Sequence, residues 1–101
     1  MTVIRSRATE REILRPLWKV HILHHAGEAP IIGNWMLEEL RQHGYRVSPG
    51  TLYPLLGRMA RLGWLSRSRE GRYRLTAAGR RTLAEVRARL LELQHEVFSK
   101  S

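Results

Sequence analysis

The clearest pattern of apolar and polar positions lies between Ser48 and Leu62. Apolar residues recur there at helical spacing, and they predict one buried helix face: Leu52, Leu55, Leu56, Met59 and Leu62. The opposite face carries small residues and an arginine: Gly50, Pro54, Gly57 and Arg61. Thr51, Tyr53 and Arg58 flank that face. Ser48 is expected to cap this helix, and Pro49 fits its first position. A helix with glycines and arginines facing outward can approach another polymer closely.

The N-terminal third also reads as helical. Thr9 and Glu12 resemble a capping box, after which an apolar pattern begins at Ile13. Pro16 is expected to divide this pattern into a short helix and a second, buried helix that ends near Gly27. Residues 27–30 read as a loop. A third helix is predicted for residues 32–43, with three inward residues: Ile32, Met36 and Leu40.

After residue 63 the pattern of apolar and polar positions changes from helical spacing to alternation. Residues 64–69 and 72–75 alternate around Glu70 and Gly71, which predicts a short β-hairpin with a tight turn. Thr76 can cap a last helix of about residues 77–98. That helix has a seam typical of coiled coils, made of Leu83, Val86, Leu90, Leu93 and Val97.

The order helix, helix, helix, hairpin, helix predicts a mainly α fold with a small β-hairpin. Two helices joined by the short turn of residues 44–47 form a helix-turn-helix, and the basic hairpin forms its wing. We therefore expect a winged helix-turn-helix DNA-binding domain with an N-terminal helix in residues 1–76. Residues 77–101 are expected to be a C-terminal dimerisation helix, in one compact unit with that domain.

The charge distribution favours a nucleic-acid partner. The chain has 18 lysines and arginines against nine acids, a formal net charge of +9, and sixteen of these bases are arginine. Residues 41–82 hold ten arginines and a single acid, Glu70, whereas residues 20–40 hold three glutamates and no lysine or arginine. A stretch of one sign around a helix indicates a polyanionic partner.

The composition also limits the other possibilities. The chain has no cysteine, and it has no aspartate either. Together with the lack of a Walker-type glycine loop, this argues against an enzyme, and no cofactor is expected. The N-terminal residues are polar and no stretch approaches about 20 apolar residues, so we expect neither a signal peptide nor a membrane span. A cytoplasmic protein is the simplest expectation.

Several side chains are candidate DNA contacts, and each has a plainer alternative. On the predicted recognition helix, Tyr53 either touches DNA or packs on the core, and Arg58 and Arg61 either reach DNA or are only solvated charges. The wing arginines either reach phosphates or the minor groove or simply keep an edge strand soluble: Arg67, Arg69, Arg72 and Arg74.

Two further groups have open roles. His21 and His25 have the i,i+4 spacing of a metal-binding pair, and His24 lies beside them. The chain has no cysteine or aspartate to complete a metal site, and Glu28 is the only acid nearby. We therefore prefer the interpretation that these histidines pack in the protein or at an interface. Trp18 and Trp35 read as core aromatics.

The sequence resembles the PadR family of bacterial winged-helix transcription regulators over about residues 13–97. The resemblance rests on Ser-Pro-Gly-Thr-Leu-Tyr-Pro-Leu-Leu at residues 48–56 and on Tyr-Arg-Leu-Thr at residues 73–76. It implies homodimers that bind pseudo-palindromic operators, usually as repressors, and a last helix that crosses to the other subunit. It further implies that Ser48, Gly50, Thr51 and Tyr53 read DNA. The chain is similar to the shorter subfamily with one C-terminal helix, some of whose members bind flat aromatic compounds between the subunits. The resemblance makes Trp18, and also Trp35, candidate residues of such an effector cavity.

Two features depart from the family pattern. Members often have His-Gly-Tyr where this chain has Ile32-Gly33-Asn34, so the backbone contact of that tyrosine is not expected here. The wing is short and turns at Glu70, which favours shallow contact between the wing and DNA.

Two other hypotheses for the function stay open. One is a winged-helix protein-interaction module without specific DNA binding, and the other is a non-specific nucleic-acid packager.

Overall fold

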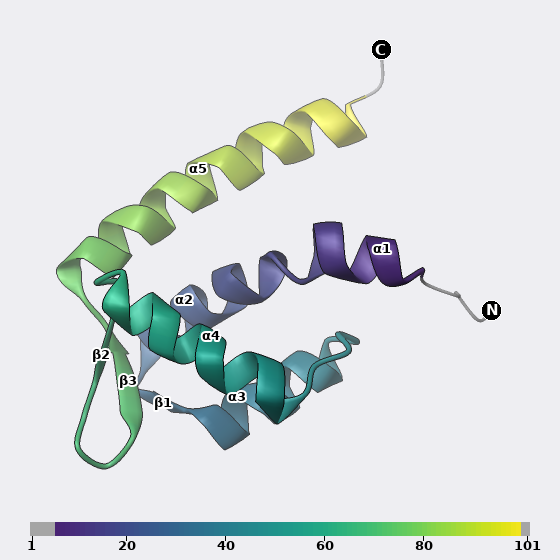
Figure 1. Ribbon diagram of the computed structural model, residues 1–101. Helices are drawn as coiled ribbons and strands as arrows, with labels where there is room; N and C mark the ends of the chain where they lie inside the picture. Colours follow the sequence, from purple (N-terminus) through teal and green to yellow (C-terminus); the bar gives the residue numbers. More distant parts are fainter. Residues whose placement is uncertain (1–5, 100–101) are drawn as a thin grey trace.

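The computed structural model describes residues 6–99 (Figure 1). Its elements follow in this order: α1 Arg7–Thr9, the π-helix η1 Glu10–Leu14, α2 Leu17–Glu28, β1 Ile31–Ile32, α3 Gly33–Gln42, α4 Pro49–Arg61, β2 Leu65–Arg67, β3 Arg72–Leu75 and α5 Ala77–Phe98. The chain is elongated, with principal extents of 50 × 29 × 19 Å. The outer ends of the two predicted domains, residues 1–5 and 100–101, lie outside the described residues.

The first helix starts earlier than its sequence predicts. Ser6, not Thr9, is the N-cap, and its hydroxyl oxygen accepts a hydrogen bond of 3.0 Å from the backbone N–H of Thr9. The predicted Thr9–Glu12 capping box is therefore wrong, because Thr9 already has helical backbone angles. Residues around Pro16 separate this segment from α2, as predicted.

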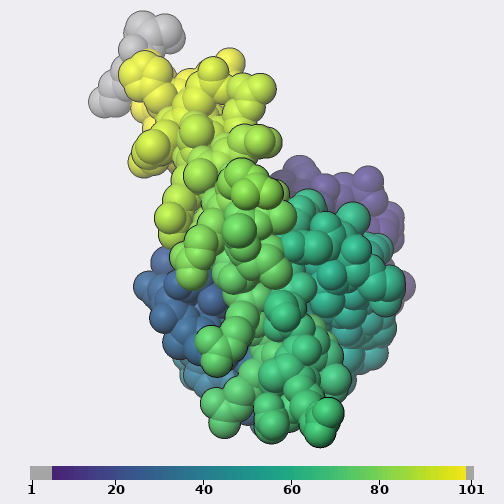
Figure 2. Space-filling model, turned by 90° about the vertical axis from the view of Figure 1, so that its left-hand side faces the viewer, coloured from purple at the N-terminus to yellow at the C-terminus, as the bar shows by residue number. Residues whose placement is uncertain are grey.

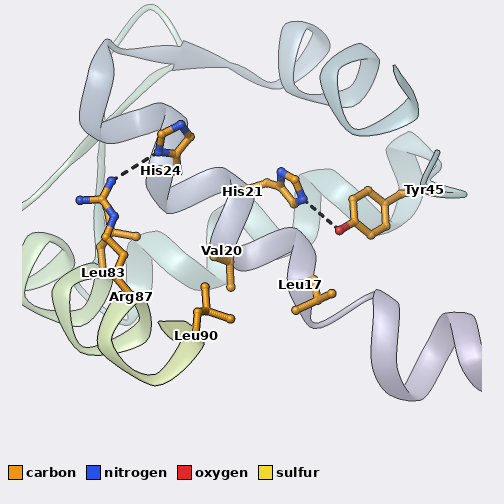
Figure 3. A pocket seen from close by; sticks show the side chains of 8 residues that line it. All are labelled: Leu17, Val20, His21, His24, Tyr45, Leu83, Arg87 and Leu90. Carbon is orange, nitrogen blue, oxygen red and sulfur yellow. Dashed lines mark hydrogen bonds between the residues drawn. The ribbon is translucent and has the colours of Figure 1, made fainter. Parts of the chain in front are cut away.

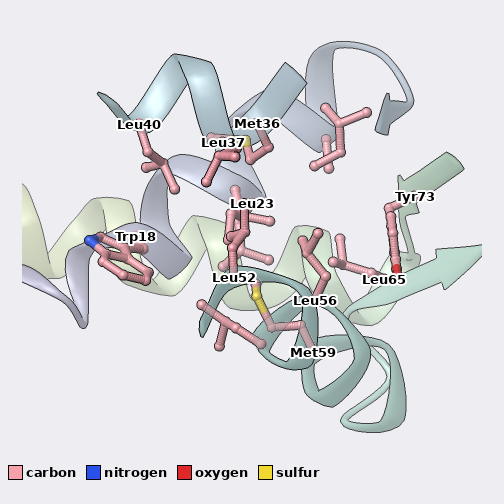
Figure 4. Close-up of a cluster of buried hydrophobic side chains, with 14 of the residues drawn as sticks. Trp18, Leu23, Met36, Leu37, Leu40, Leu52, Leu56, Met59, Leu65 and Tyr73 are labelled. Carbon is pink, nitrogen blue, oxygen red and sulfur yellow. The ribbon is translucent and has the colours of Figure 1, made fainter. Parts of the chain in front are cut away.

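The core lies where α2, α3 and α4 meet (Figure 4). The inward face of α4 is confirmed for four residues, each no more than 7% exposed: Leu52, Leu55, Leu56 and Met59. Leu62 is 54% exposed, so its predicted burial is wrong. The reason is that α4 ends at Arg61 and Leu62 stands at the C-cap, outside the last regular turn. Met36 and Leu40 of α3 are fully buried against α4, as predicted.

The sheet has three strands rather than the predicted two. β1 pairs antiparallel with β3, with Ile31 opposite Tyr73, so the strand order is β1-β3-β2. Ile31 is buried and Ile32 is 46% exposed, which overturns the expected inward position of Ile32 in a helix. A two-residue strand has no periodicity of its own, and only its pairing with β3 defines it.

Helix α5 begins as predicted and then leaves the body of the protein. Thr76 caps it, since its hydroxyl oxygen accepts a hydrogen bond of 2.9 Å from the backbone N–H of Gly79. Leu83 packs into the core, whereas the second half of the helix projects away from the other elements (Figures 1 and 2). Within residues 6–99, no helix combines the length and the apolar character needed to cross a bilayer.

Candidate nucleic-acid interface

One side of α4 is free to meet a ligand. Gly50, Tyr53, Arg58 and Arg61 are exposed, and Thr51 is half-buried. They lie away from the leucines that anchor α4 in the core, so the helix is held from behind and presents small and basic residues outward. This is the geometry that insertion into a DNA groove requires.

The start of α4 differs in one detail from its sequence prediction. Ser48 is the N-cap and Pro49 the first helical residue, but the Ser48 hydroxyl makes no capping hydrogen bond to the backbone. Its oxygen lies 3.2 Å from the hydroxyl oxygen of Thr51 instead. The predicted side-chain cap is therefore wrong, and the backbone N–H groups of Thr51 and Leu52 are bonded to the carbonyl oxygen of Ser48, at 3.1 and 3.0 Å.

The turn that leads into α4 is fixed by local contacts. Gly44 has a φ of 92°, a left-handed conformation that glycine adopts without strain. Arg41 Nε donates a hydrogen bond of 3.2 Å to the carbonyl oxygen of Val47, and the Val47 side chain is buried. These contacts set the angle between α3 and α4, the two helices of the helix-turn-helix.

Tyr53 combines exposure with contact to a neighbouring helix. Its side chain remains 44% exposed, while its ring packs against the backbone of Gly33 at the start of α3. The absence of a side chain at position 33 provides the space for the ring. Tyr53 is thus held in one orientation from one side and accessible from the other.

A basic hollow joins α4 to the start of α2. Its volume is about 300 Å³, and its walls include four cationic side chains: Arg15, Lys19, Arg58 and Arg61. The guanidinium of Arg15 also lies 5.5 Å from the centre of the Trp18 ring, a cation–π contact that orients it. Sequence reasoning missed Arg15 and Lys19 as interface residues. The excess of basic residues in residues 1–19 pointed to them, but only the tertiary packing of the chain brings them next to α4.

The four wing arginines are all exposed but do not share one face. Arg74 lies opposite Ser66, and Arg67 lies opposite Tyr73, whose ring faces the core. Since opposed residues share a face and neighbours alternate, Arg72 and Arg74 point outward while Arg67 falls on the core side at the end of its strand. Arg69 belongs to the turn, which protrudes away from the far half of α5 (Figures 1 and 2).

An apolar groove of about 390 Å³ lies between α2 and α5 (Figure 3). Its lining consists of Leu17, Val20, His21, His24, Tyr45, Leu83, Arg87 and Leu90. Trp18, the predicted effector contact, lies instead in the core at 1% exposure and borders the basic hollow. Trp35 was expected in the core or in an effector cavity, and it is 45% exposed.

The predicted dimerisation seam divides into two parts. Leu83 is buried within the chain, and Val86 is half-buried. Leu90, Leu93 and Val97 are 38%, 53% and 60% exposed, and Leu91 and Phe98 add further apolar surface beside them. The far half of α5 thus carries an apolar surface that nothing within residues 6–99 covers.

Comparison with known proteins agrees with this geometry. Residues 22–85 match the model of the transcriptional regulator PadR-like family. The chain is 49% identical over 95 residues to the transcriptional regulator Rv3488 of Mycobacterium tuberculosis, covering 87% of this chain and 89% of that protein.

Two solved structures have a similar fold. One is a PadR-like transcription factor from Bacteroides fragilis, with a TM-score of 0.71 and 27% identity over 88% of this chain and 94% of that one. The other is a PadR family transcriptional regulator from Eggerthella lenta, with a TM-score of 0.69 and 29% identity over 85% of this chain and 82% of that one.

Proposed function

The chain belongs to the PadR-like family of transcriptional regulators, and from this premise we propose that it is a homodimeric repressor that binds a pseudo-palindromic operator. Each subunit inserts α4 into a major groove, and two-fold symmetry places the two helices about 34 Å apart. Since the operator is part of the chromosome, we expect the protein to act in the cytoplasm.

The observation that carries this proposal is the exposed side of α4 together with the basic hollow beside it. Ser48, Gly50, Thr51 and Tyr53 stand at the first turns of the helix and are proposed to meet base edges and the adjacent backbone. Arg58 and Arg61 follow toward its end, where the hollow supplies two more cations. Phosphate contacts from these arginines provide affinity, and contacts to bases provide sequence preference.

The wing is proposed to add contacts at its tip. Arg69 in the turn and the outward Arg72 and Arg74 can reach phosphates or the minor groove, with Arg67 beside them at the end of β2. Glu70 stands at the tip and is repelled by phosphate, so the engagement is expected to be shallow.

The partner of the exposed far half of α5 is proposed to be the α5 helix of a second copy. Leu90, Leu93 and Val97 repeat at coiled-coil spacing, with Leu83 and Val86 continuing the seam into the body. Apolar side chains at this density on a projecting helix are expected to be covered in a stable protein. Pairing of two such helices gives the two-fold symmetry that a pseudo-palindrome requires.

Regulation by a small aromatic effector is also part of the proposal. The groove between α2 and α5 is open and largely apolar, and it shares Leu83 and Leu90 with the proposed dimer seam. A flat compound bound there can change the spacing of the two α4 helices only by favouring one geometry of the dimer over another. Trp18 is not among the residues that line this groove, so its contact with an effector stays a separate prediction.

The test is a footprint on the DNA upstream of the coding region. We expect the purified protein to protect an inverted repeat there, with two equal half-sites one helical turn apart. The same DNA with its half-sites scrambled serves as the control and should bind at least about 10³-fold more weakly. Equal binding to both DNAs would indicate a non-specific packager, and weak, salt-insensitive binding to both would favour the protein-interaction module.

A further inference from the structure

Outside the proposed DNA and dimer surfaces, three histidines from two different helices come together. His21 and His25 lie one turn apart on α2, and His43 stands at the C-cap of α3. One ligand-competent atom from each of the three lies within 4.8 Å of the others. The rings of His21 and His43 have centroids 4.8 Å apart. Residues separated by 18 positions in the sequence thus form one compact set of nitrogen donors.

A carboxylate joins this cluster. Glu39 Oε2 lies 3.1 Å from His43 Nε2 and 3.4 Å from His25 Nε2, so a single oxygen contacts two of the three rings. The Glu39 side chain is only 22% exposed and that of His25 only 17% exposed. Three imidazoles and one carboxylate make a four-ligand set, and these are donor types that bind zinc.

From this arrangement we propose that His21, His25, His43 and Glu39 bind a divalent transition-metal ion, Zn²⁺ in the first instance. A tetrahedral ion with ligands at about 2.0–2.1 Å holds its donor atoms about 3.3–3.4 Å apart, so the three histidine nitrogens, which lie within 4.8 Å of one another, must close by up to about 1.5 Å. Side-chain rotation of His43, which is 47% exposed, can supply much of this movement.

The hydrogen bonding of His21 also suits a metal ligand. His21 Nε2 is hydrogen-bonded to the Tyr45 hydroxyl at 2.9 Å (Figure 3), which leaves Nδ1 as its second ring nitrogen. A histidine that ligates through one nitrogen while the other is hydrogen-bonded is the usual arrangement at metal sites.

A second group of possible ligands overlaps with this one. His24, His25 and Glu28 lie on α2 alone, where the His24 and Glu28 side chains are 45% and 64% exposed. The first group is the better site because its ligands converge from two helices and are more buried. The ion would then tie α2 to the end of α3, next to the turn that leads into α4.

The test uses the whole protein and Zn²⁺ or Co²⁺ alone, without DNA. We expect one Zn²⁺ per chain by calorimetry and a melting temperature that rises with metal concentration, as ligand linkage requires. Co²⁺ should give the intense visible absorption of a four-coordinate site. His43→Ala and Glu39→Gln should each lower Zn²⁺ affinity at least about tenfold, since even outer-shell partners contribute 10–100-fold.

Matched controls separate this site from its neighbour. His24→Ala should leave Zn²⁺ binding unchanged, whereas Glu28→Gln, whose side chain lies 3.8 Å from His25 Nδ1, should weaken it less than Glu39→Gln does. Circular dichroism without metal should show every variant folded. Absence of binding, or loss of binding in the His24 and Glu28 variants but not in His43→Ala, would overturn the proposal. Because no step involves DNA, this outcome is independent of whether the footprint finds an operator.

Discussion

The ring of Tyr53 on α4 lies so close to the backbone of Gly33 on α3 that a Cβ atom at position 33 would fall 2.1 Å from Tyr53 Cε1. The two residues are 20 positions apart and belong to the two helices of the helix-turn-helix. The glycine therefore determines where an exposed aromatic side chain of the proposed recognition surface stands.

Gly33→Ala is expected to displace Tyr53, because the ring is partly in solvent and can move while the helix backbone cannot. The free energy of unfolding should fall by about 1–3 kcal/mol, as in other over-packed sites. If Tyr53 contacts a base or the adjacent DNA backbone, operator affinity should fall about tenfold or more, as it should in Tyr53→Ala. Chemical denaturation and binding titrations measure the two effects.

The two substitutions should not be additive. In the Tyr53→Ala background, Gly33→Ala removes no further ring contact, so a double-mutant cycle should show strong coupling in both measurements. Purely additive effects would mean that Gly33 acts on DNA binding by another route.

A substitution at Gly50 tests the close approach of α4 to the DNA groove and leaves the fold intact. A Cβ at position 50 would meet only Ser48 Oγ, at 4.0 Å, so larger side chains fit the free protein. We expect Gly50→Leu to keep its melting temperature within a few degrees and to lose operator affinity at least tenfold, because the leucine would separate α4 from the groove. Ala77→Leu, at the exposed start of α5, is the matched control. Unchanged affinity in Gly50→Leu would show that the start of α4 does not enter the groove.

Much of this fold follows from local patterns, as α4 and α5 illustrate. Leu52 and Met59 recur at helical spacing because a single helix face packs on the core, and Thr76 caps α5 through a contact three residues away. Local periodicity and capping rules are sufficient for such elements.

The features that the sequence did not predict are those made by contacts between distant segments. Ile31 and Ile32 form a strand only because β3 lies beside them. Lys19 meets Arg61 in the basic hollow only because α2 packs near α4. Likewise, the pairing of His21 and His25 was visible as an i,i+4 spacing, but Glu39 and His43 join them only through the packing of α3 on α2.

The basic hollow can be tested through the salt dependence of binding. Each phosphate contact contributes about 0.9 to the slope of log affinity against log salt, and a symmetric dimer makes every contact twice. Arg61→Ala and Lys19→Ala should therefore each lower the slope by about 1.8 and weaken operator and scrambled DNA alike. Arg89→Ala on α5, where Arg89 pairs with Glu92 at 2.9 Å, should leave the slope unchanged. A normal slope in Lys19→Ala would place α2 outside the interface.

The last prediction concerns the dimer seam, because DNA binding by two subunits depends on it. Leu93 and Val97 are more than half exposed, so replacing both with glutamate should not disturb the folded chain. Like charges on paired helices should instead convert the dimer to monomer in sedimentation velocity, and operator affinity should fall by about 10²–10⁴ because the second half-site is no longer linked to the first. Ala88→Glu, about 140° round the helix from Leu83, adds one glutamate on the other side and should remain dimeric. A dimer that survives Leu93→Glu with Val97→Glu would mean that the two copies meet through another surface.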